Sequence, residues 1–485
     1  MSIKVDWNAD GDFSDSGEDV SSYARFPITT SRGRSKTTDE FKAGSARFAL
    51  ANEDGRFSPL YASSPLYPNV RPGREVVIEV TYNGTTYPVL RGRCTPERQA
   101  SGLPAEVEFS ALDAFEELRN GLTNTALLQS KRVDEVITAI LDDIGWDAGR
   151  RDLGTGPDTL TVFTNHNRLP INALQLAAAQ DPGGAMFIAR DGDVTYQNRY
   201  YRSGQAVYAT LAGTFNDLDP QLRQEDVVEA VRATFPRFEV SSALATVWSL
   251  QLPRRLRPGV TEFEVELNAS GVLGATGYVT PVATTDYIAE TAQDGSGTDK
   301  TAQVTAAIAS SDSGGAVLQF TNADSSDVWL QADGATKLRA YPLQEGGEVN
   351  AIRKAVSTPL VANQTLSRAF EFLDDEDVVE GWVSWQRNVR GDFRVRPVVE
   401  IVPDTDALMA VVLGAEIGKR VTLTDTGAAW LTQVDGDYVI EGIEMEFRGP
   451  GEVRAVWRLF DADLAIGSMF RVGVSAIGGS DRIGY

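Results

Sequence analysis

The first hundred residues alternate between apolar and polar positions at the period of a β-strand. The alternation is visible in "SIKVDW" (2–7) and again in "SARFALANEDGRFSP" (45–59). Residues 74–93 predict a hairpin, because Asn83-Gly84 is a favoured type I′ turn between two alternating runs. Residues 105–120 then pass from period two into a short helix. These patterns predict a small β-barrel or sandwich that closes with this helix.

The pattern changes to a helical period in "KRVDEVITAILDDIGW" (131–146), where Gly145 is placed to end the helix. A second helix is expected at "PINALQLAAAQ" (170–180). The next segment, "GAMFIARDGDVTYQNR" (184–199), predicts a hairpin around an Asp-Gly turn. Helices next to a short hairpin indicate an α/β unit.

From about residue 224 the pattern is that of β-strands again. Residues 259–340 resemble a separate insertion of short strands with Gly-, Ser- and Thr-rich connections, for which a small sandwich is the simplest interpretation. We expect an amphipathic helix near 367–376, followed by strong strands up to about residue 460. The Gly/Ser-rich end of the chain, 461–485, is expected to become ordered only against a partner.

Composition narrows the class of protein. The chain has 485 residues, which predicts roughly three or four domains. Its net charge of -23 argues against a dedicated nucleic-acid binder, although it is compatible with a protein that lets DNA pass without holding it. One cysteine and one histidine exclude an intrachain disulfide, a cysteine metal cluster and a multi-histidine zinc site. We see no secretory signal and no apolar run long enough for a membrane span, so a soluble chain is expected.

The candidate metal site lies in "VDWNADGDFSDSGEDV" (5–20). The oxygen-bearing side chains of Asp6, Asn8, Asp10 and Asp12 fall at every second position, and Gly11 provides a sharp turn, as at the start of a calcium-binding loop. The closing carboxylate of such a loop would fall at Gly17, and Glu18 comes one residue late. The alternative is an acidic turn in which these side chains bond their own backbone.

No arrangement of residues predicts an active site. His166 has no G-x-S-x-G segment to serve, and the acidic run at 372–382 is typical of a solvated face or loop. Two Gly-rich stretches, 154–157 and 295–300, complete no nucleotide-binding pattern, so no cofactor other than calcium is expected. Cys94 is expected to be a half-buried thiol. We therefore expect a protein that is not an enzyme.

Several motifs together resemble the minor tail proteins of tailed phages. The chain begins with a D-W-x-x-D-G-x-F turn and continues with a G-x-x-x-x-x-L-x-N-x-D-G-R-[FY]-S-P element from Gly44 to Pro59. A P-G-R strand and its hairpin follow. Later segments that resemble the family are "ALDAFEELRN", "VITAILDDIGW", "GGAMFIARDGDVTYQNR" and the closing strands "AEIGKRVTLTD…DGDYVIEGIEMEF". The resemblance covers most of the chain, and it is loose over 259–340 and after 460.

This resemblance implies the tail hub, or baseplate hub, family and therefore a multidomain, mainly β fold. The expected units are two small β-barrel-type domains, one α/β domain and an inserted β-sandwich. Their expected boundaries are a first barrel at 1–118, the α/β domain at 119–205, a second barrel with a helix at 206–258 and 341–460, the insertion at 259–340 and a tail at 461–485.

The resemblance also implies a function in assembly. Proteins of this family form homotrimers whose six barrels make a pseudo-hexameric ring, which adapts the tail tube to a threefold tip and lets DNA pass. The implied partners are the distal tail ring protein, tail-tip fibre or spike proteins, the tape measure protein and genomic DNA in transit. The implied location is the tail tip of the virion, after assembly in the host cytoplasm. The alternatives are a receptor- or carbohydrate-binding tail protein that uses the insertion, with Trp329, Tyr278 and Tyr287 as candidate contacts, and a cell-wall hydrolase.

Overall fold

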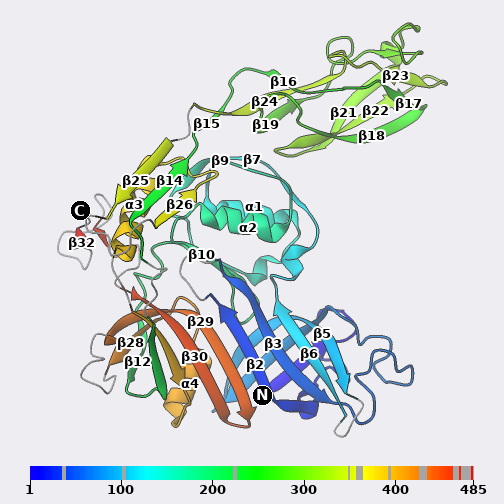
Figure 1. The fold of residues 1–485 in the computed structure, drawn as a ribbon. Coiled ribbons are helices and arrows are strands. Elements are labelled where there is room, and N and C mark those ends of the chain that lie inside the picture. The colour runs from blue at the N-terminus through cyan, green and yellow to red at the C-terminus, as the bar shows by residue number, and fades with distance from the viewer. Residues whose placement is uncertain are drawn as a thin grey trace.

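The structure is a computed structural model that describes residues 1–34, 40–100, 105–221, 227–347, 350–356, 364–391, 395–424, 434–462, 469–470 and 482–483. It confirms the expected multidomain, mainly β architecture. Three regions can be followed in Figure 1: a pair of curved sheets at the bottom, a central body that contains the helices α1 and α2, and an insertion that projects at the upper right.

The two curved halves at the bottom belong to one continuous 12-stranded sheet, which is built from both ends of the chain. The first barrel contributes the strands β1 (Ser2–Asp6), β4 (Arg74–Tyr82), β5 (Thr85–Ala100), β6 (Glu106–Asp113), β3 (Lys42–Ala51) and β2 (Ala24–Gly33) in sheet order. The second barrel contributes β29 (Gly436–Gly449), β30 (Glu452–Asp461), β27 (Arg396–Ile401), β13 (Asp217–Gln221), β28 (Arg420–Thr424), β12 (Val207–Ala212) and the helix α4 (Asp406–Gly414). A single hydrophobic cluster runs through both barrels, from Ile3 and Phe109 to Trp457.

The long strand β29 joins the two barrels, because one of its edges pairs first with a strand of the second barrel and then with a strand of the first. Near its start it pairs with β28 of the second barrel, from Gly436 to Val439. From Gly442 to Phe447 it pairs antiparallel with β2 of the first barrel. The change of partner therefore falls at Glu441, where the pairing with β30 on the opposite edge also shifts register.

The central body has two parts that share one hydrophobic cluster. The first part contains the antiparallel pair β7 (Thr123–Arg132) and β9 (Thr159–Arg168), the three-stranded sheet β10 (Ala185–Ile188), β11 (Val194–Gln197) and β8 (Arg151–Leu153), and the helices α1 (Val133–Asp143) and α2 (Pro170–Ala179). The second part is the helix α3 (Glu376–Arg390) on the three-stranded sheet β25 (Asn350–Ala355), β14 (Ala230–Phe235) and β26 (Thr365–Ala369).

The insertion has a hydrophobic cluster of its own. Its strands are β15 (Phe238–Val240), β16 (Ala245–Ser249), β17 (Arg254–Leu256), β18 (Gly259–Glu266), β19 (Gly274–Val279), β20 (Ala289–Glu290), β21 (Val304–Ser311), β22 (Gly315–Asn322), β23 (Val328–Leu330) and β24 (Lys337–Glu345). Residues expected in the second barrel, 206–258 and 341–460, are thus distributed over the second barrel, the α3 part of the body and the insertion. Residue periodicity alone does not distinguish strands of these three sheets.

The insertion contacts the body at two places. At its base, β15 pairs antiparallel with the end of β24, and the backbone N–H of Ser241 donates to Pro342 at 2.9 Å. Ser313 forms the second contact: its backbone N–H donates to the carbonyl of Thr125 at 2.9 Å, and its hydroxyl accepts from the backbone N–H of Asn165 at 3.0 Å. We therefore predict that replacing residues 243–340 with a Gly-Ser-Gly turn leaves the barrels and the body folded. The expected result is a single cooperative unfolding transition at a moderately lower temperature, because Thr125 and Asn165 lose their hydrogen bonds to Ser313. The measurement is circular dichroism and intrinsic fluorescence during heating. Loss of that cooperative transition would show that the insertion supports the core of the body.

The helices show where the sequence pattern was informative. The predicted α1 and α2 are confirmed, and α1 is followed by Gly145 at a φ of 68°, a conformation that favours glycine. The prediction of a helix near 367–376 is wrong. Residues 365–369 form β26, and α3 begins only at Glu376, after the N-cap Asp375. The helix expected within 105–120 is reduced to the short 3-10 turn Glu117–Arg119. None of the helices described here is both long enough and apolar enough to cross a lipid bilayer.

Candidate functional site: the junction of the barrels and the opening turn

A buried carboxylate lies where β29 changes partner. Glu441 is 4% exposed, and its two oxygens accept from Arg34 Nε and Arg202 Nη1, each at 2.5 Å. Arg34 follows β2 of the first barrel, whereas Arg202 lies between the body and the second barrel. Glu441 of β29 therefore binds both the end of β2 and the segment that leads from the body into the second barrel.

The charges at this junction depend on each other. Burial alone would raise the pKa of Glu441, but Arg202 and Arg34 outweigh burial and hold that pKa below its ordinary value. Burial lowers the pKa of Arg202 to about 10, although Glu441 acts in the opposite direction. Removing either member of such a buried pair leaves an uncompensated charge, which is costly.

A second ion pair reinforces the same junction. Arg32 of β2 donates through Nη1 to Glu416 Oε1 at 2.8 Å, and the backbone N–H of Arg190 contacts Glu416 Oε2 at 3.3 Å. Arg190 also donates through Nη1 to the carbonyl of Leu413, at the end of α4. These contacts fasten the β10–β11 hairpin of the body to both barrels.

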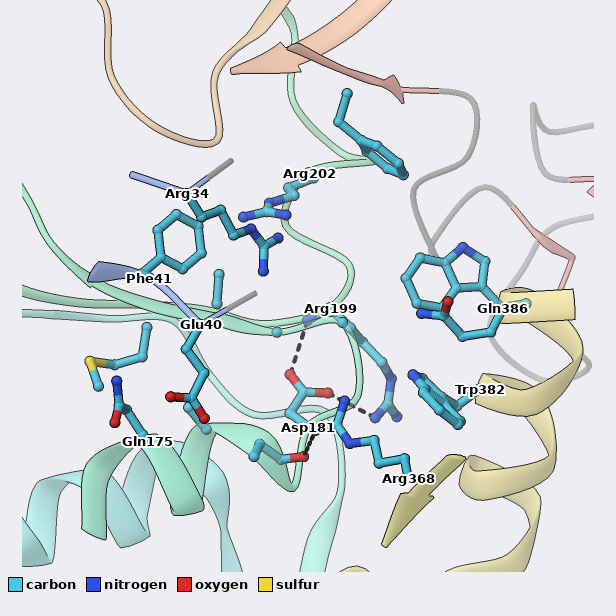
Figure 2. Close-up of a pocket in the computed structure, with 18 of the residues that line it drawn as sticks. Arg34, Glu40, Phe41, Gln175, Asp181, Arg199, Arg202, Arg368, Trp382 and Gln386 are labelled. Atoms are coloured by element: carbon cyan, nitrogen blue, oxygen red, sulfur yellow. Dashed lines mark hydrogen bonds and ion pairs between the residues drawn. The ribbon is translucent and has the colours of Figure 1, made fainter. Parts of the chain in front are cut away.

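Next to this junction lies a cavity of about 390 Å³ that is partly open to solvent. Residues from all three neighbouring parts line it, as Figure 2 shows: Arg34, Glu40 and Phe41 come from the first barrel, Gln175, Asp181, Arg199 and Arg202 from the body, and Arg368, Trp382 and Gln386 from β26 and α3. The cavity therefore lies at the place where the barrels meet both parts of the body.

The carboxylate of Asp181 anchors one wall of the cavity. It accepts from the hydroxyl of Tyr196 at 2.6 Å, from Arg199 Nη1 at 2.9 Å and from the backbone N–H of Arg199 at 3.0 Å. Burial raises its pKa to about 6, and the hydrogen bonds from Tyr196 and Arg199 act against that rise. Nearby, Arg368 donates through Nη2 to the carbonyl of Ala179 at 2.6 Å.

The opening turn is the second candidate site. The carboxylates of Asp6, Asp10 and Glu18 lie within 4.8 Å of one another, so the structure brings together two of the four predicted ligands and adds Glu18. The side-chain N–H of Asn8 donates to Asp10 Oδ2, with 2.9 Å between Nδ2 and Oδ2. Asp12 accepts from the backbone N–H of Ser14 at 2.8 Å and is not part of the carboxylate cluster.

The local geometry explains why Glu18 joins the cluster. Gly17 has a φ of 91°, which reverses the chain, and the carbonyl of Gly17 accepts from Trp7 Nε1 at 3.1 Å. The side chain of Glu18 is thereby buried beside Asp6. Burial, together with the neighbouring carboxylates, raises the pKa of Glu18, whereas a hydrogen bond from the backbone of Asp15 opposes the rise. Three clustered carboxylates have the hard oxygens that calcium prefers.

The calcium prediction can be tested at this turn. If calcium binds, adding it should raise the melting temperature of the protein, because a ligand that binds only the folded state stabilises it. The Glu18→Gln variant should lose this increase, whereas Asp12→Asn, which changes a residue outside the cluster, should keep it. The measurement is differential scanning calorimetry with calcium and with a chelator; identical melting curves for the unmodified protein would retire the metal site.

The other singled-out residues lie elsewhere. His166 at the end of β9 contacts Asp312 of the insertion through Nδ1 at 2.8 Å, which places the histidine at the contact between insertion and body. Cys94 is fully buried, so the expectation of a half-buried thiol is wrong, and burial raises the pKa of this thiol to about 12. The acidic run at 372–382 supplies the N-terminus of α3, where Asp375 accepts from the backbone N–H of Asp377 at 2.9 Å.

The buried pair at Glu441 was not predicted, although the sequence contains a signal for it. Ile443, Met445 and Phe447 of β29 face the core, and Glu441 lies in phase with them at the period of a strand. A carboxylate in phase with core positions indicates a buried partner. Its partners, Arg34 and Arg202, lie far away in the sequence and carry no comparable signal.

Comparison with known proteins gives the fold. No protein-family profile and no curated protein sequence matches the chain. A tail protein from Neisseria meningitidis has a similar structure, with a TM-score of 0.50 and 10% sequence identity over 96% of this chain and 97% of that one. The 43 kDa tail protein of prophage MuSo2 from Shewanella oneidensis gives a TM-score of 0.48 at 10% identity, over 96% of this chain and 100% of that one. The chain therefore has the fold of a tail protein, as the sequence resemblance predicts.

Proposed function

We propose that this chain is a structural hub protein at the tail tip of a tailed virus. In this proposal three copies associate, and their six barrels form a pseudo-hexameric ring that adapts the tail tube to a threefold tip. The observation that carries the proposal is the pairing of β2 with β29, which fuses two barrels of one chain into a single sheet. Each chain thereby provides two adjacent ring segments in a fixed relation.

The partners follow from that position in the tail. The ring would dock under the distal tail ring protein, support fibre or spike proteins, contact the tape measure protein and let genomic DNA pass. The net charge of -23 supports a conduit, because acidic walls release no counterions from DNA and so do not retain it. A lumen lined with basic side chains in the assembled ring would contradict this part of the proposal.

The proposal predicts a trimer. Analytical ultracentrifugation should give the mass of three 52.5 kDa chains at high protein concentration, and negative-stain images should show a ring with threefold symmetry. Because a hub assembles beneath the tail ring, the measurement is repeated with the distal tail ring protein present. A chain that stays monomeric under both conditions would overturn the proposal.

The alternative of carbohydrate binding through the insertion receives less support. Tyr287 is buried and donates its hydroxyl to the carbonyl of Val304 at 2.6 Å. Trp329 and Tyr278 are only half-exposed, so the three candidate aromatic residues do not form an open stacking surface. The proposed role requires no catalysis, and clearing of peptidoglycan by the purified protein would favour the hydrolase alternative.

A further inference from the structure

The cavity beside the barrel junction contains a buried arginine that leaves three of its five guanidinium N–H donors without a partner among the described residues. Arg202 is 6% exposed and donates to Glu441 through Nη1. Its Nε and Nη2 have no hydrogen-bond partner among the described residues. These two nitrogens form the side edge of the guanidinium, which matches the two oxygens of a carboxylate or phosphate.

A second buried polar group in the same cavity lacks a hydrogen-bond donor, whereas Arg202 lacks an acceptor. Gln386 of α3 is also 6% exposed, and its Oε1 accepts no hydrogen bond from the described residues. In Figure 2 Gln386 lies on the α3 side of the cavity, away from Arg202. Leaving such groups unpaired costs free energy in a folded protein. A ligand that satisfies both groups needs an oxyanion and a hydrogen-bond donor.

The charged groups at the cavity are four arginines and four carboxylates. Arg34, Arg199, Arg202 and Arg368 line the cavity together with Glu40 and Asp181, while Glu441 pairs with Arg34 and Arg202 and Asp158 pairs with Arg199. An anion would therefore be held by the unused donors of Arg202 and not by an excess of positive charge. The carboxylate of Asp181 is already engaged by Tyr196 and Arg199. Burial lowers the pKa of Arg368 to about 10, as it does that of Arg202, so the neighbouring carboxylates compensate burial of these two cations only in part.

The size and walls of the cavity fit an organic molecule. Its volume of about 390 Å³ lies within the range of roughly 300–1,000 Å³ that is usual for ligand pockets. Four aromatic side chains, from Phe41, Trp382, Trp385 and Phe460, provide apolar surface around the charged groups. An inorganic ion would satisfy the arginines and leave this surface and Gln386 without a contact.

We propose that this cavity binds a small organic oxyanion, either a carboxylate or a phosphate ester, that also carries a hydroxyl group. Arg202 donates to the oxyanion through Nε and Nη2, and Gln386 Oε1 accepts from the hydroxyl. Since the lining comes from the first barrel, from both parts of the body and, through Phe460, from the second barrel, the cavity lies where these parts meet. The proposal is independent of the trimeric ring.

The test uses the full-length protein and two probes that share this chemistry. Citrate provides carboxylates with a hydroxyl, and glycerol 3-phosphate provides a phosphate with hydroxyls. Binding is measured by isothermal titration calorimetry and by intrinsic tryptophan fluorescence, to which Trp382 and Trp385 of the cavity lining contribute, at constant ionic strength set with sodium chloride. We expect saturable binding of one probe, and the identity of that probe distinguishes carboxylate from phosphate. Absence of saturable binding for both probes would overturn the proposal.

Two variants assign the binding to this cavity. Arg202→Gln should weaken binding by about tenfold or more, because it removes a charge-assisted pair of donors. Arg237→Gln is the control for the loss of one charge: Arg237 is an exposed arginine that pairs with Glu376 and does not line the cavity, so binding should be unchanged. Equal affinity of Arg202→Gln and the unmodified protein would overturn the assignment.

A third variant decides the question if Arg202→Gln fails to fold. Gln386→Leu removes the unpaired oxygen without disturbing the ion pair at Glu441. It should weaken binding of the hydroxyl-bearing probe by roughly two- to tenfold, as expected for one neutral hydrogen bond. Its melting temperature without ligand should not fall, because the oxygen has no described partner to lose. Unchanged affinity in this variant would contradict the proposed role of Gln386.

Discussion

Replacing Gly33 with alanine is expected to open the connection between the two barrels. Gly33 ends β2 at a φ of 103°, and a Cβ atom there would lie 2.3 Å from the carbonyl oxygen of Glu441 and 2.6 Å from the Cα of Gly442. The left-handed conformation costs an alanine about 1–2 kcal/mol, and the overlap with the backbone of β29 adds about 1–3 kcal/mol. We therefore expect a loss of about 2–5 kcal/mol in the free energy of unfolding of the barrel pair.

The measurement is urea unfolding followed by tryptophan fluorescence, a signal to which the buried Trp7 and Trp457 of the two barrels contribute, and by far-ultraviolet circular dichroism. Gly451→Ala is the control, because Gly451, in the turn between β29 and β30, also has a positive φ of 79°, but no atom lies within 4 Å of the added Cβ. This control should lose only about 1–2 kcal/mol, the cost of the backbone conformation. Equal losses in the two variants would show that the close approach of β2 and β29 is unimportant for stability.

Replacing Glu441 with glutamine is expected to have an effect of similar size. The substitution leaves Arg34 and Arg202 without their shared carboxylate, and removing one partner of a buried pair costs about 3–5 kcal/mol. The variant should therefore unfold at a clearly lower urea concentration at pH 7. Glu446→Gln on the same strand is the control: Glu446 pairs with the half-exposed Arg448, so its loss should be much smaller.

The loss at Glu441 should also depend on pH. The folded protein holds the pKa of Glu441 below its ordinary value of about 4.3, so its carboxylate stabilises the fold above that value. This contribution is lost as the pH falls through the lowered pKa of the folded state. The difference in stability between the unmodified protein and Glu441→Gln should therefore shrink below about pH 4. A difference that stays constant down to pH 3 would show that the charge of Glu441 does not stabilise the junction.

Features encoded by neighbouring residues could be predicted from the sequence. The hairpin at Asn83-Gly84 forms as expected, with φ values of 47° and 80° at these two residues. Helix α1 follows from its apolar period, and the backbone N–H of Arg132 donates to Glu135 Oε2 at 2.9 Å at its start. In both cases the signal and the structure that it predicts lie within about twenty residues of each other.

Features that depend on distant partners could not be predicted in the same way. Periodicity shows which face of β29 is buried, but it does not show that the neighbouring strand changes from β28 to β2 at Glu441. Helix α4 was not expected, because "DALMAVVLG" is apolar on nearly every side and resembles a buried strand. Glu18 joins Asp6 and Asp10 because Gly17 reverses the chain, which a fixed ligand spacing does not anticipate.

The pairing of β2 with β29 has a consequence for biosynthesis. Arg34 and Glu441 are 407 residues apart, so the ribosome has made most of the chain before the edge of β2 can be covered by its partner. At about 5–20 residues per second this edge stays open for roughly 20–80 s. An open strand edge can pair with another chain, and polysomes hold many such edges close together. Correct folding of the barrel pair therefore competes with association between nascent chains, and slower translation should shift that competition toward aggregates.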